Sequence, residues 1–330
     1  MSRRRLGLVL AVALVLTAWI VLSLVSPAPT LTSSHRVVVG RGESAAAVAG
    51  RLERQGLIRS AFTFRLAARL GGRWPQVKQG TYLVRPGMSA LRILDLFTSG
   101  RVEQLRLTVP EGWTVRDIGL LLHQRGIGDG SPLTRQDAPR VPAGLPLPAD
   151  GRLEGYLFPD TYFTPTGAPA RQFLAERMLA RLDELVWRGL LGGRPAPDGR
   201  SLHQVLTLAS LVEAEAKLPR ERPLIAGVLA SRLRAGRRLE CDATVQYALG
   251  EARRRLTYDD LEVDSPYNTY RHAGLPPGPI CNPGLASIRA ALHPTPVPYL
   301  YYVARPDGSH VFTRSYQEHL AAIRAIRGSR

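Results

Sequence analysis

Hydrophobic and polar positions divide the chain into one long apolar run and a series of shorter strand-like and helical segments. The run extends from Leu6 to Val25 without a charged residue, and arginines at positions 3 to 5 precede it. Its twenty residues are about what a helix rising 1.5 Å per residue needs to cross the hydrocarbon of a bilayer. We therefore predict a transmembrane helix over residues 6–26, after an N-terminus of residues 1–5.

The arginines before the run favour a cytoplasmic N-terminus, which would place everything after Ser26 outside the cytoplasm. A cleaved signal peptide is the competing interpretation. Its apolar core would hold about 7 to 15 residues, however, and no clean A-x-A cleavage site follows the run. Residues 27–35, PAPTLTSSH, predict a linker. We expect a single-pass protein of the cytoplasmic (inner) membrane whose main part is extracytoplasmic, or periplasmic.

A short pattern recurs three times after the linker. In each copy an alternating segment meets a glycine, then a Ser or Thr able to cap a helix, then an amphipathic helical pattern. The copies are RVVVGRGESAAAVAGRL from Arg36, TYLVRPGMSALRILDLF from Thr81 and RLTVPEGWTVRDIGLLL from Arg106. They predict β-turn-α units in an N-terminal subdomain over residues 36–130. Such units are also common as plain packing modules.

A second domain is expected over residues 151–330, because residues 125–150 are rich in Gly, Pro and Asp, as at a domain junction. The periodicity predicts helices at about 171–189, 202–218 and 223–235. Further along it predicts a helix over LASIRAALH, a hairpin turning at Asp307-Gly308 and a last helix from Tyr316. The segment 264–284 has no period. The predicted fold class is α+β.

The helix over 202–218 carries two acidic residues, Glu213 and Glu215, beside an apolar stripe. Residues two apart on a helix point about 200° away from each other, so these two cannot be the acid and nucleophile pair of a glycosidase. They lie on opposite flanks of the stripe, and the periodicity does not choose between them. An acidic residue at such an edge is usually solvated, and less often has a raised pKa for proton transfer. The stripe consists of Leu208, Ala209, Val212 and Ala216.

One buried carboxylic acid can still break a glycosidic bond when the substrate supplies its own nucleophile. The acid protonates the leaving oxygen, and its carboxylate then accepts the proton of the sugar's C6 hydroxyl as that oxygen closes on C1. The product is a 1,6-anhydro sugar, and no water is consumed. This chemistry needs one carboxyl group with a raised pKa, and polar groups that hold the sugar and stabilise the developing charge.

The net charge of +17 would suggest a nucleic-acid partner, but the expected location outside the cytoplasm excludes it. The excess positive charge is scattered along the chain and comes almost wholly from Arg. The remaining explanation for it is attraction to anionic lipids or to an anionic cell-wall polymer. The two cysteines, Cys241 and Cys281, have no metal-site spacing, and no CxxC or HExxH occurs. We expect neither metal nor cofactor. One disulfide and two buried thiols remain alternatives.

Several blocks in the second half resemble, in order, those of the endolytic murein transglycosylases, the MltG or YceG-like family. They are ASLVEAEA, RLRAGRRLECDATVQYALG, SPYNTYRHAGLPPGPICNPG and ALHPTPVPYLYYVA followed by SHVFTRSYQEH. Upstream, EGWTVRDIGLLL and LEGYLFPDTYF are similar to the same family. VVVGRGESAAAVAGRLERQGL is loosely similar to the LysM-type modules that bind peptidoglycan glycan. The resemblance implies a mixed α+β catalytic domain over 151–330, preceded by small LysM-like modules.

The resemblance also implies roles for single residues. Glu213 matches the catalytic glutamate, as the first acidic residue of the block, and Glu215 matches a second acidic position in the substrate cleft. The acidic aromatic block around Glu154 and Tyr156 is expected to provide packing more than cleft wall, and the histidines at 272, 293, 310 and 319 are expected to be solvated or structural. The remaining residues implied to bind substrate are Asp242, Thr244, Tyr247, Tyr267, Asn268, Thr269 and Tyr270.

The implied function is that of a membrane-anchored lytic transglycosylase. It would cut MurNAc–GlcNAc bonds inside nascent peptidoglycan strands, leave 1,6-anhydroMurNAc ends and terminate strand elongation beside the peptidoglycan synthases. The alternatives are a non-catalytic wall-binding or divisome scaffold and a hydrolytic muramidase. Expected partners are peptidoglycan strands, the lipid bilayer through the N-terminal helix, and synthases, with no nucleic acid.

Overall fold

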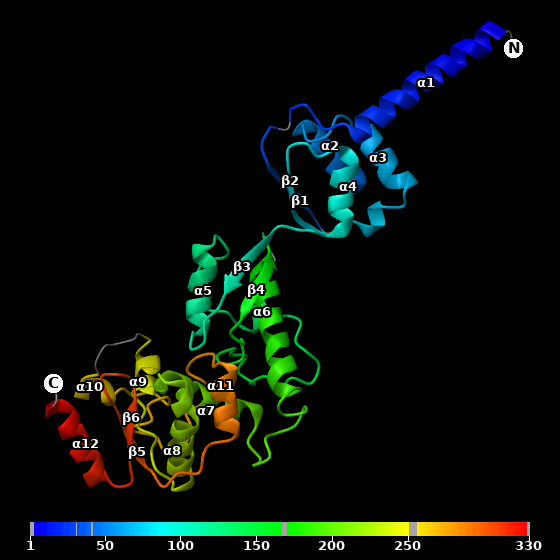
Figure 1. Ribbon diagram of the computed structural model, residues 1–330. Helices are drawn as coiled ribbons and strands as arrows, with labels where there is room; N and C mark the ends of the chain where they lie inside the picture. The colour runs from blue at the N-terminus through cyan, green and yellow to red at the C-terminus, as the bar shows by residue number, and fades with distance from the viewer. Residues whose placement is uncertain (1–2, 31, 41, 167–169, 251–255, 329–330) are drawn as a thin grey trace. The chain divides into compact units, whose positions relative to one another are not determined.

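The computed structural model describes residues 3–30, 32–40, 42–166, 170–250 and 256–328, and its elements are mixed α+β, as predicted (Figure 1). The chain forms two compact units. The first comprises residues 1–105 and 163–170, and the second comprises 106–162 and 171–330. The third predicted β-turn-α unit, from Arg106, therefore falls in the second unit together with the paired glutamates.

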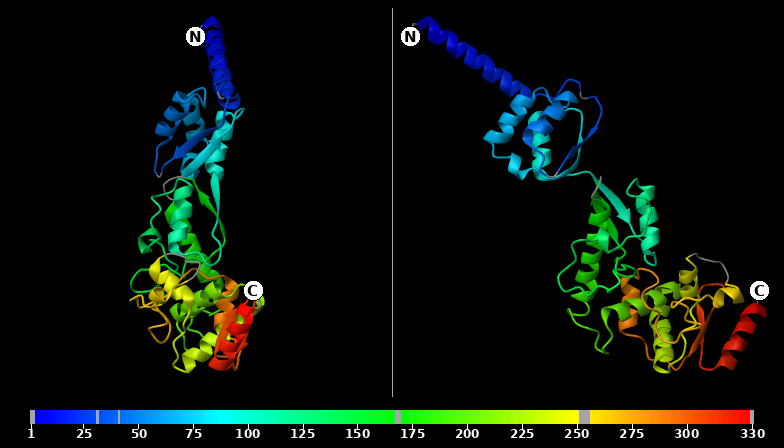
Figure 2. Two further views of the ribbon diagram at one scale, coloured as in Figure 1. Left: turned by 90° about the vertical axis from the view of Figure 1, so that its left-hand side faces the viewer. Right: turned by 180° about the vertical axis from the view of Figure 1, so that it is seen from behind.

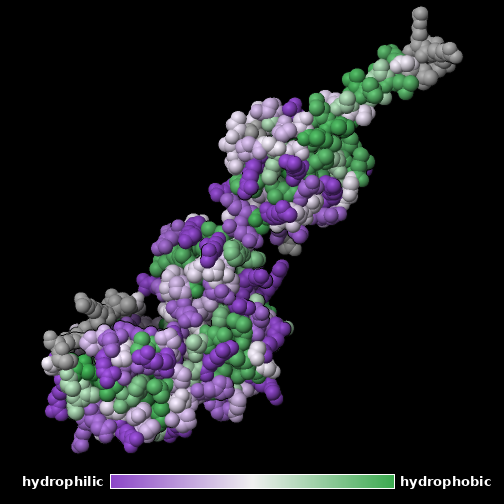
Figure 3. All heavy atoms as spheres, in the orientation of Figure 1, coloured by the Kyte–Doolittle hydropathy of each residue, from purple (hydrophilic) through white to green (hydrophobic). Residues whose placement is uncertain are grey.

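The N-terminal helix α1 (Arg3–Val25) carries no charged residue after its first three arginines. Residues 7–25 are long and apolar enough to cross a membrane, and the visible face of this segment is hydrophobic in Figure 3. Leu14 and Val15 leave 74% and 66% of their surface exposed, a state that hydrocarbon accommodates better than water does. The helix is compatible with a membrane anchor.

The rest of the first unit is built around one antiparallel strand pair. Strand β1 (His35–Val39) pairs with β2 (Gly80–Val84), with Val37 opposite Tyr82, so two of the predicted units share one sheet. Helices α2 (Ala45–Arg54), α3 (Ala61–Leu70) and α4 (Ala90–Ser99), with the short turn η1 (Trp74–Gln76), surround the core. Ser44 and Ser89 cap α2 and α4 as predicted.

A second strand pair joins β3 (Gln104–Thr108) to β4 (Thr161–Pro165). Strand β4 begins within the aromatic block LEGYLFPDTYF and is not among the predicted elements. The third β-turn-α unit continues into α5 (Val115–Gln124), where Thr114 and Asp117 form a capping box. A short turn, η2 (Arg135–Asp137), follows.

Three packed helices form the centre of the second unit: α7 (Leu202–Glu215), α8 (Arg222–Arg234) and α11 (Leu285–Leu292). Helix α7 begins with a capping box of Ser201 and Gln204, and nearly every residue from its start to Val212 is buried. On α8, a Cβ at Gly227 would lie 2.1 Å from the Thr295 carbonyl oxygen, so only glycine permits this approach. Earlier in the chain, helix α6 (Ala170–Leu182) ends in a π turn, η3 (Asp183–Trp187).

A terminal hairpin and helix complete the second unit. Strand β5 (Tyr301–Ala304) pairs with β6 (His310–Thr313) across the predicted turn, and α12 (Tyr316–Gly328) packs against both strands (Figure 2). Between α7 and this hairpin lie η4 (Pro219–Glu221), α9 (Asp242–Leu249) and α10 (Tyr258–Leu261). The segment without periodicity is largely irregular, as predicted.

Candidate active site

The C-terminal end of α7 carries both glutamates on the border of the core. Val212 is fully buried, whereas Glu213 and Glu215 are each partly exposed. The helix ends at Ala216, whose backbone is extended. As the helical spacing requires, the two carboxyl groups have different surroundings.

The Glu213 carboxylate is held by two donors. Its Oε1 accepts a hydrogen bond of 3.1 Å from Arg222 Nη2, and its Oε2 accepts one of 3.0 Å from the Gly284 backbone N–H. The side chains of Glu213 and Arg222 are 8% and 13% exposed, so this is a largely buried ion pair. Because Arg222 begins α8 and Gly284 caps α11, Glu213 ties together the starts of the two helices that pack on α7.

A third acidic residue, Glu111, lies next to this ion pair. Its carboxylate is 3.8 Å from Arg222 Nη2, and burial, followed by the nearby charge of Glu213, raises the pKa of Glu111. A Cβ at Gly284 would lie 1.9 Å from Glu111 Oε1, so glycine is required for the carboxylate to lie there. Glu111, Glu213 and Arg222 thus form a cluster of opposite charges at the N-terminal ends of α8 and α11.

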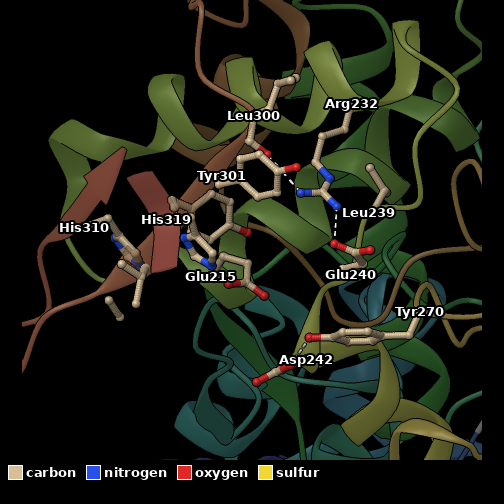
Figure 4. Close-up of a pocket in the computed structure, with 13 residues that line it drawn as sticks. Glu215, Arg232, Leu239, Glu240, Asp242, Tyr270, Leu300, Tyr301, His310 and His319 are labelled. Carbon is tan, nitrogen blue, oxygen red and sulfur yellow. Dashed lines mark hydrogen bonds and ion pairs between the residues drawn. The ribbon is translucent and has the colours of Figure 1, made fainter. Parts of the chain in front are cut away.

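Glu215 lines a cavity of about 400 Å³. Figure 4 shows the lining side chains gathered around it, from α8, α9, the hairpin β5–β6 and α12. Its volume lies within the range of about 300 to 1,000 Å³ that is typical of ligand pockets. The other lining residues are Arg232, Leu239, Glu240, Asp242, Tyr270, Leu300, Tyr301, Tyr302, Val303, Ala304, His310 and His319.

The cavity changes the acidity of Glu215. Burial and, to a smaller extent, the negative charge of Asp242 raise its pKa to about 7, although a hydrogen bond with the Tyr302 side chain lowers it. A carboxyl group with a pKa near neutrality exists in both protonation states under working conditions, which is what a group that first donates and then accepts a proton requires. Glu215 therefore combines a raised pKa with a position on a cavity wall.

Two polar pairs frame the Glu215 cavity. The Tyr270 hydroxyl donates a hydrogen bond of 2.5 Å to Asp242 Oδ1, which fixes an acidic side chain at the cavity wall. Arg232 forms an ion pair with Glu240 and donates a hydrogen bond of 2.9 Å to the Leu300 carbonyl oxygen. The Arg232 guanidinium also lies over the Tyr301 ring, 5.3 Å from its centroid. These contacts hold the cavity walls in place before substrate arrives.

Three of the residues expected to bind substrate are instead buried in the scaffold. Asn268 is fully buried and donates hydrogen bonds of 2.8 and 3.0 Å to the carbonyl oxygens of Leu261 and Val263. The hydroxyls of Thr244 and Thr269 lie 2.9 Å apart in the interior. Their polar groups shape the irregular segment and α9, while Glu215, Asp242 and Tyr270 line the cavity.

Tyr247 and Tyr267, also expected to bind substrate, belong to a different cluster. Their ring centroids are 4.9 Å apart, and the Tyr247 hydroxyl lies 3.4 Å from a carboxylate oxygen of Glu154. Burial raises the pKa of Glu154 to about 8, and Asn282 Nδ2 also contacts this carboxyl at 3.3 Å. Tyr156 is likewise buried, which agrees with the packing role expected for this block.

Six of the polar or aromatic residues that line the Glu215 cavity have no site role predicted from the sequence. The resemblance blocks contained all of them, but their inward orientation depends on the hairpin and on α8. Of the histidines, His310 is buried and bonded to Glu221 at 2.7 Å, which is a structural contact. His319 has its pKa lowered by burial. The six are Arg232, Glu240, Tyr301, Tyr302, His310 and His319.

Both cysteines are free, buried thiols, so the structure agrees with the second of the two alternatives and not with a disulfide. Cys281 Sγ lies 3.5 Å from the Ser210 carbonyl oxygen and Cys241 Sγ lies 3.8 Å from that of Leu239. Burial raises the pKa of each thiol, which keeps both protonated and unreactive. Within the described ranges, no group of three or more His, Cys, Asp or Glu side chains is placed to hold a metal ion.

Comparisons with known proteins agree with this architecture. The chain is 33% identical to an endolytic murein transglycosylase of Bacillus subtilis (strain 168) over 293 residues, which cover 84% of this chain and 81% of the relative. It is 28% identical to that of Streptococcus pneumoniae (strain ATCC BAA-255 / R6), covering 87% of this chain but 57% of the relative.

A crystal structure of a YceG-like protein from Listeria monocytogenes is similar at a TM-score of 0.56 and 30% identity, covering 88% of this chain and 99% of that one. The model of the YceG-like family matches residues 37–325, nearly all of the chain beyond the N-terminal helix and linker. The chain therefore belongs to the YceG-like family.

Proposed function

We propose that this protein is a peptidoglycan lytic transglycosylase that uses Glu215 as its only proton-transfer group. The observation that carries the proposal is a carboxyl group, with a pKa raised to about 7, on the wall of a polar cavity. Relatives named endolytic murein transglycosylase, at up to 33% identity over most of the chain, support the substrate class.

The reaction needs one acid acting twice. Protonated Glu215 donates its proton to the glycosidic oxygen as the C1–O bond breaks and an oxocarbenium-like centre develops at C1. The C6 hydroxyl oxygen of the same sugar then bonds to C1 and releases its proton to the Glu215 carboxylate. The acid is regenerated, the product ends in a 1,6-anhydro sugar, and no water is consumed.

The other lining residues supply position and charge. Asp242, fixed by the Tyr270 hydroxyl, places negative charge where positive charge develops on the sugar. The Tyr302 side chain, which is hydrogen-bonded to Glu215, orients the acid. Tyr301 and Tyr270 offer ring faces and hydroxyls suited to sugar rings.

This assignment moves the catalytic role from Glu213, which the resemblance implied, to its neighbour. Both Glu213 oxygens are engaged by donors of the scaffold, the Arg222 guanidinium and the Gly284 backbone N–H, whereas Glu215 lines the cavity. The proposed role of Glu213 is to hold the ends of α8 and α11 so that α7 presents Glu215 correctly.

The finer features belong to the same proposal. The apolar helix α1, preceded by arginines, would anchor the protein in the cytoplasmic membrane with its N-terminus inside and the active site outside. Cleavage inside nascent strands, between MurNAc and GlcNAc and beside the synthases, would then terminate elongation. The strand and helix units before residue 130 would act as LysM-like modules that guide the strand, and residues 151–330 would form the catalytic domain.

Mass spectrometry of the muropeptides released by the full-length, detergent-solubilised protein from purified sacculi tests the proposal. Release of 1,6-anhydroMurNAc ends is the expected result, and it should be lost in Glu215→Gln. Reducing ends, heavier by one water, would mean that Asp242 activates water and that the protein is a hydrolytic muramidase. Binding without release would mean a scaffold.

A further inference from the structure

A second cavity adjoins the one that holds Glu215. It has a volume of about 670 Å³ and shares Arg232, Glu240 and Tyr301 with the first. A ligand lying along the Glu215 cavity can therefore extend into it. We call it the arginine cavity, because its lining includes Arg232, Arg237, Arg238 and Arg271.

The arginine cavity is strongly cationic. Arg232 is neutralised by its ion pair with Glu240. This leaves the charges of Arg237 and Arg238, together with that of Arg271, whose Nη1 lies 3.9 Å from the exposed carboxylate of Asp264. Within the described part of the chain, the contacts of these three guanidiniums engage only their Nη1 atoms. Each guanidinium has five N–H groups in a planar fork, so each keeps donors directed elsewhere.

The three arginines are partly oriented by those Nη1 contacts. Arg237 donates a hydrogen bond of 2.8 Å to the Tyr301 hydroxyl, and Arg238 donates one of 2.6 Å to the Tyr270 carbonyl oxygen. Both acceptors belong to residues that also line the Glu215 cavity. Pre-ordered guanidiniums lose little conformational entropy when they bind a planar anion.

The sugar backbone of peptidoglycan offers these arginines no charge, because its amino groups are acetylated and its lactyl groups are joined to peptides. The free carboxylates of an intact strand lie on the short stem peptides. Carboxylates match the guanidinium fork with two parallel hydrogen bonds. We propose that the arginine cavity is a subsite for stem-peptide carboxylates beside the scissile bond. This inference rests on the proposed function and extends it to the choice of substrate.

The test compares two substrates and two variants of the full-length protein in detergent. The substrates are uncrosslinked strands with stem peptides and the same strands after amidase treatment, which leaves only the lactyl carboxylate at the sugar. The variant Arg237→Gln with Arg271→Gln removes two charges from the arginine cavity. The matched control, Arg220→Gln with Arg234→Gln, removes two exposed charges from the same unit that line neither cavity.

We expect the wild type to prefer peptide-bearing strands, with kcat/KM about tenfold higher, from two charge-assisted hydrogen bonds at a partly exposed site. The cavity variant should lose this preference, mainly through KM, because its kcat/KM falls more on peptide-bearing strands than on amidase-treated ones. The control pair should keep the preference. Equal cutting of both strands by wild type, or equal losses on both strands in the cavity variant, would overturn the inference.

Two further arms keep the result decisive. If the Gln variants fold poorly, raising NaCl with wild type should lower kcat/KM for peptide-bearing strands more than for amidase-treated ones, and equal salt effects would overturn the inference. A loss seen only with strands still linked to a lipid diphosphate would mean a phosphate site instead.

If wild type cuts neither strand, the proposed function fails. Weaker binding of peptide-bearing strands by the cavity variant would then still support the subsite, and unchanged binding would overturn it.

Discussion

The change Glu215→Gln separates catalysis from stability at one position. The amide keeps the shape of the side chain but cannot shuttle a proton, so cleavage should fall by about 10²–10⁴-fold. The cavity and its substrate contacts should remain. Binding of peptidoglycan strands is therefore expected to be close to that of wild type.

The same change should stabilise the protein at alkaline pH. Burial raises the pKa of Glu215 from its ordinary value of 4.5 to about 7. Below pH 4.5 the Glu215 carboxyl group is protonated in both the folded and the unfolded chain, so it costs no stability relative to an amide. Between pH 4.5 and pH 7 the carboxyl group stays protonated only in the folded chain, and the stability of the wild type therefore falls as pH rises. Above pH 7 the full cost of about 3 kcal/mol is present. Glutamine, neutral at every pH, avoids it.

Denaturant unfolding of the full-length protein at pH 4 and pH 8, together with muropeptide release, checks both parts. Glu215→Gln should match wild type at pH 4 and exceed it at pH 8. Glu213→Gln, on the same helix, is the matched control, and it should lose stability at pH 8. Wild-type cleavage by Glu215→Gln, or an identical pH dependence of stability in this variant and wild type, would refute the reasoning.

Three other predictions follow from the same contacts. Glu213→Gln should cost about 2 kcal/mol of stability, because Arg222 loses its largely buried partner, yet the folded fraction should still release anhydro ends; an inactive but fully folded variant would return the catalytic role to Glu213. The kcat/KM of wild type should fall as pH rises above about 7, where Glu215 loses its proton, and a pH profile flat to pH 9 would contradict this. Asn268→Ala should lower stability by about 2 to 3 kcal/mol, because two buried carbonyl oxygens lose their donor; unchanged stability with a raised KM would identify Asn268 as a substrate contact.

Local signals in the sequence were sufficient for most of the secondary structure. The capping residues Ser44, Ser89 and Thr114 start their helices as predicted, because a cap depends only on a few neighbouring residues. The hairpin turn at Asp307-Gly308 follows for the same reason. Strand β4 was missed because its residues pair with β3, more than fifty positions earlier, and no local pattern encodes that partner.

The sequence by itself determined the family blocks, the apolar N-terminal helix and the fact that Glu213 and Glu215 cannot share one site. Only the tertiary structure decided which of them faces a cavity, because both flank the same stripe and their surroundings come from segments remote in the chain. Arg222 and Gly284 bind the first, whereas Asp242 and the hairpin enclose the second. Burial and neighbouring charge set the pKa of a carboxyl group, and both are properties of the packed chain rather than of the local sequence.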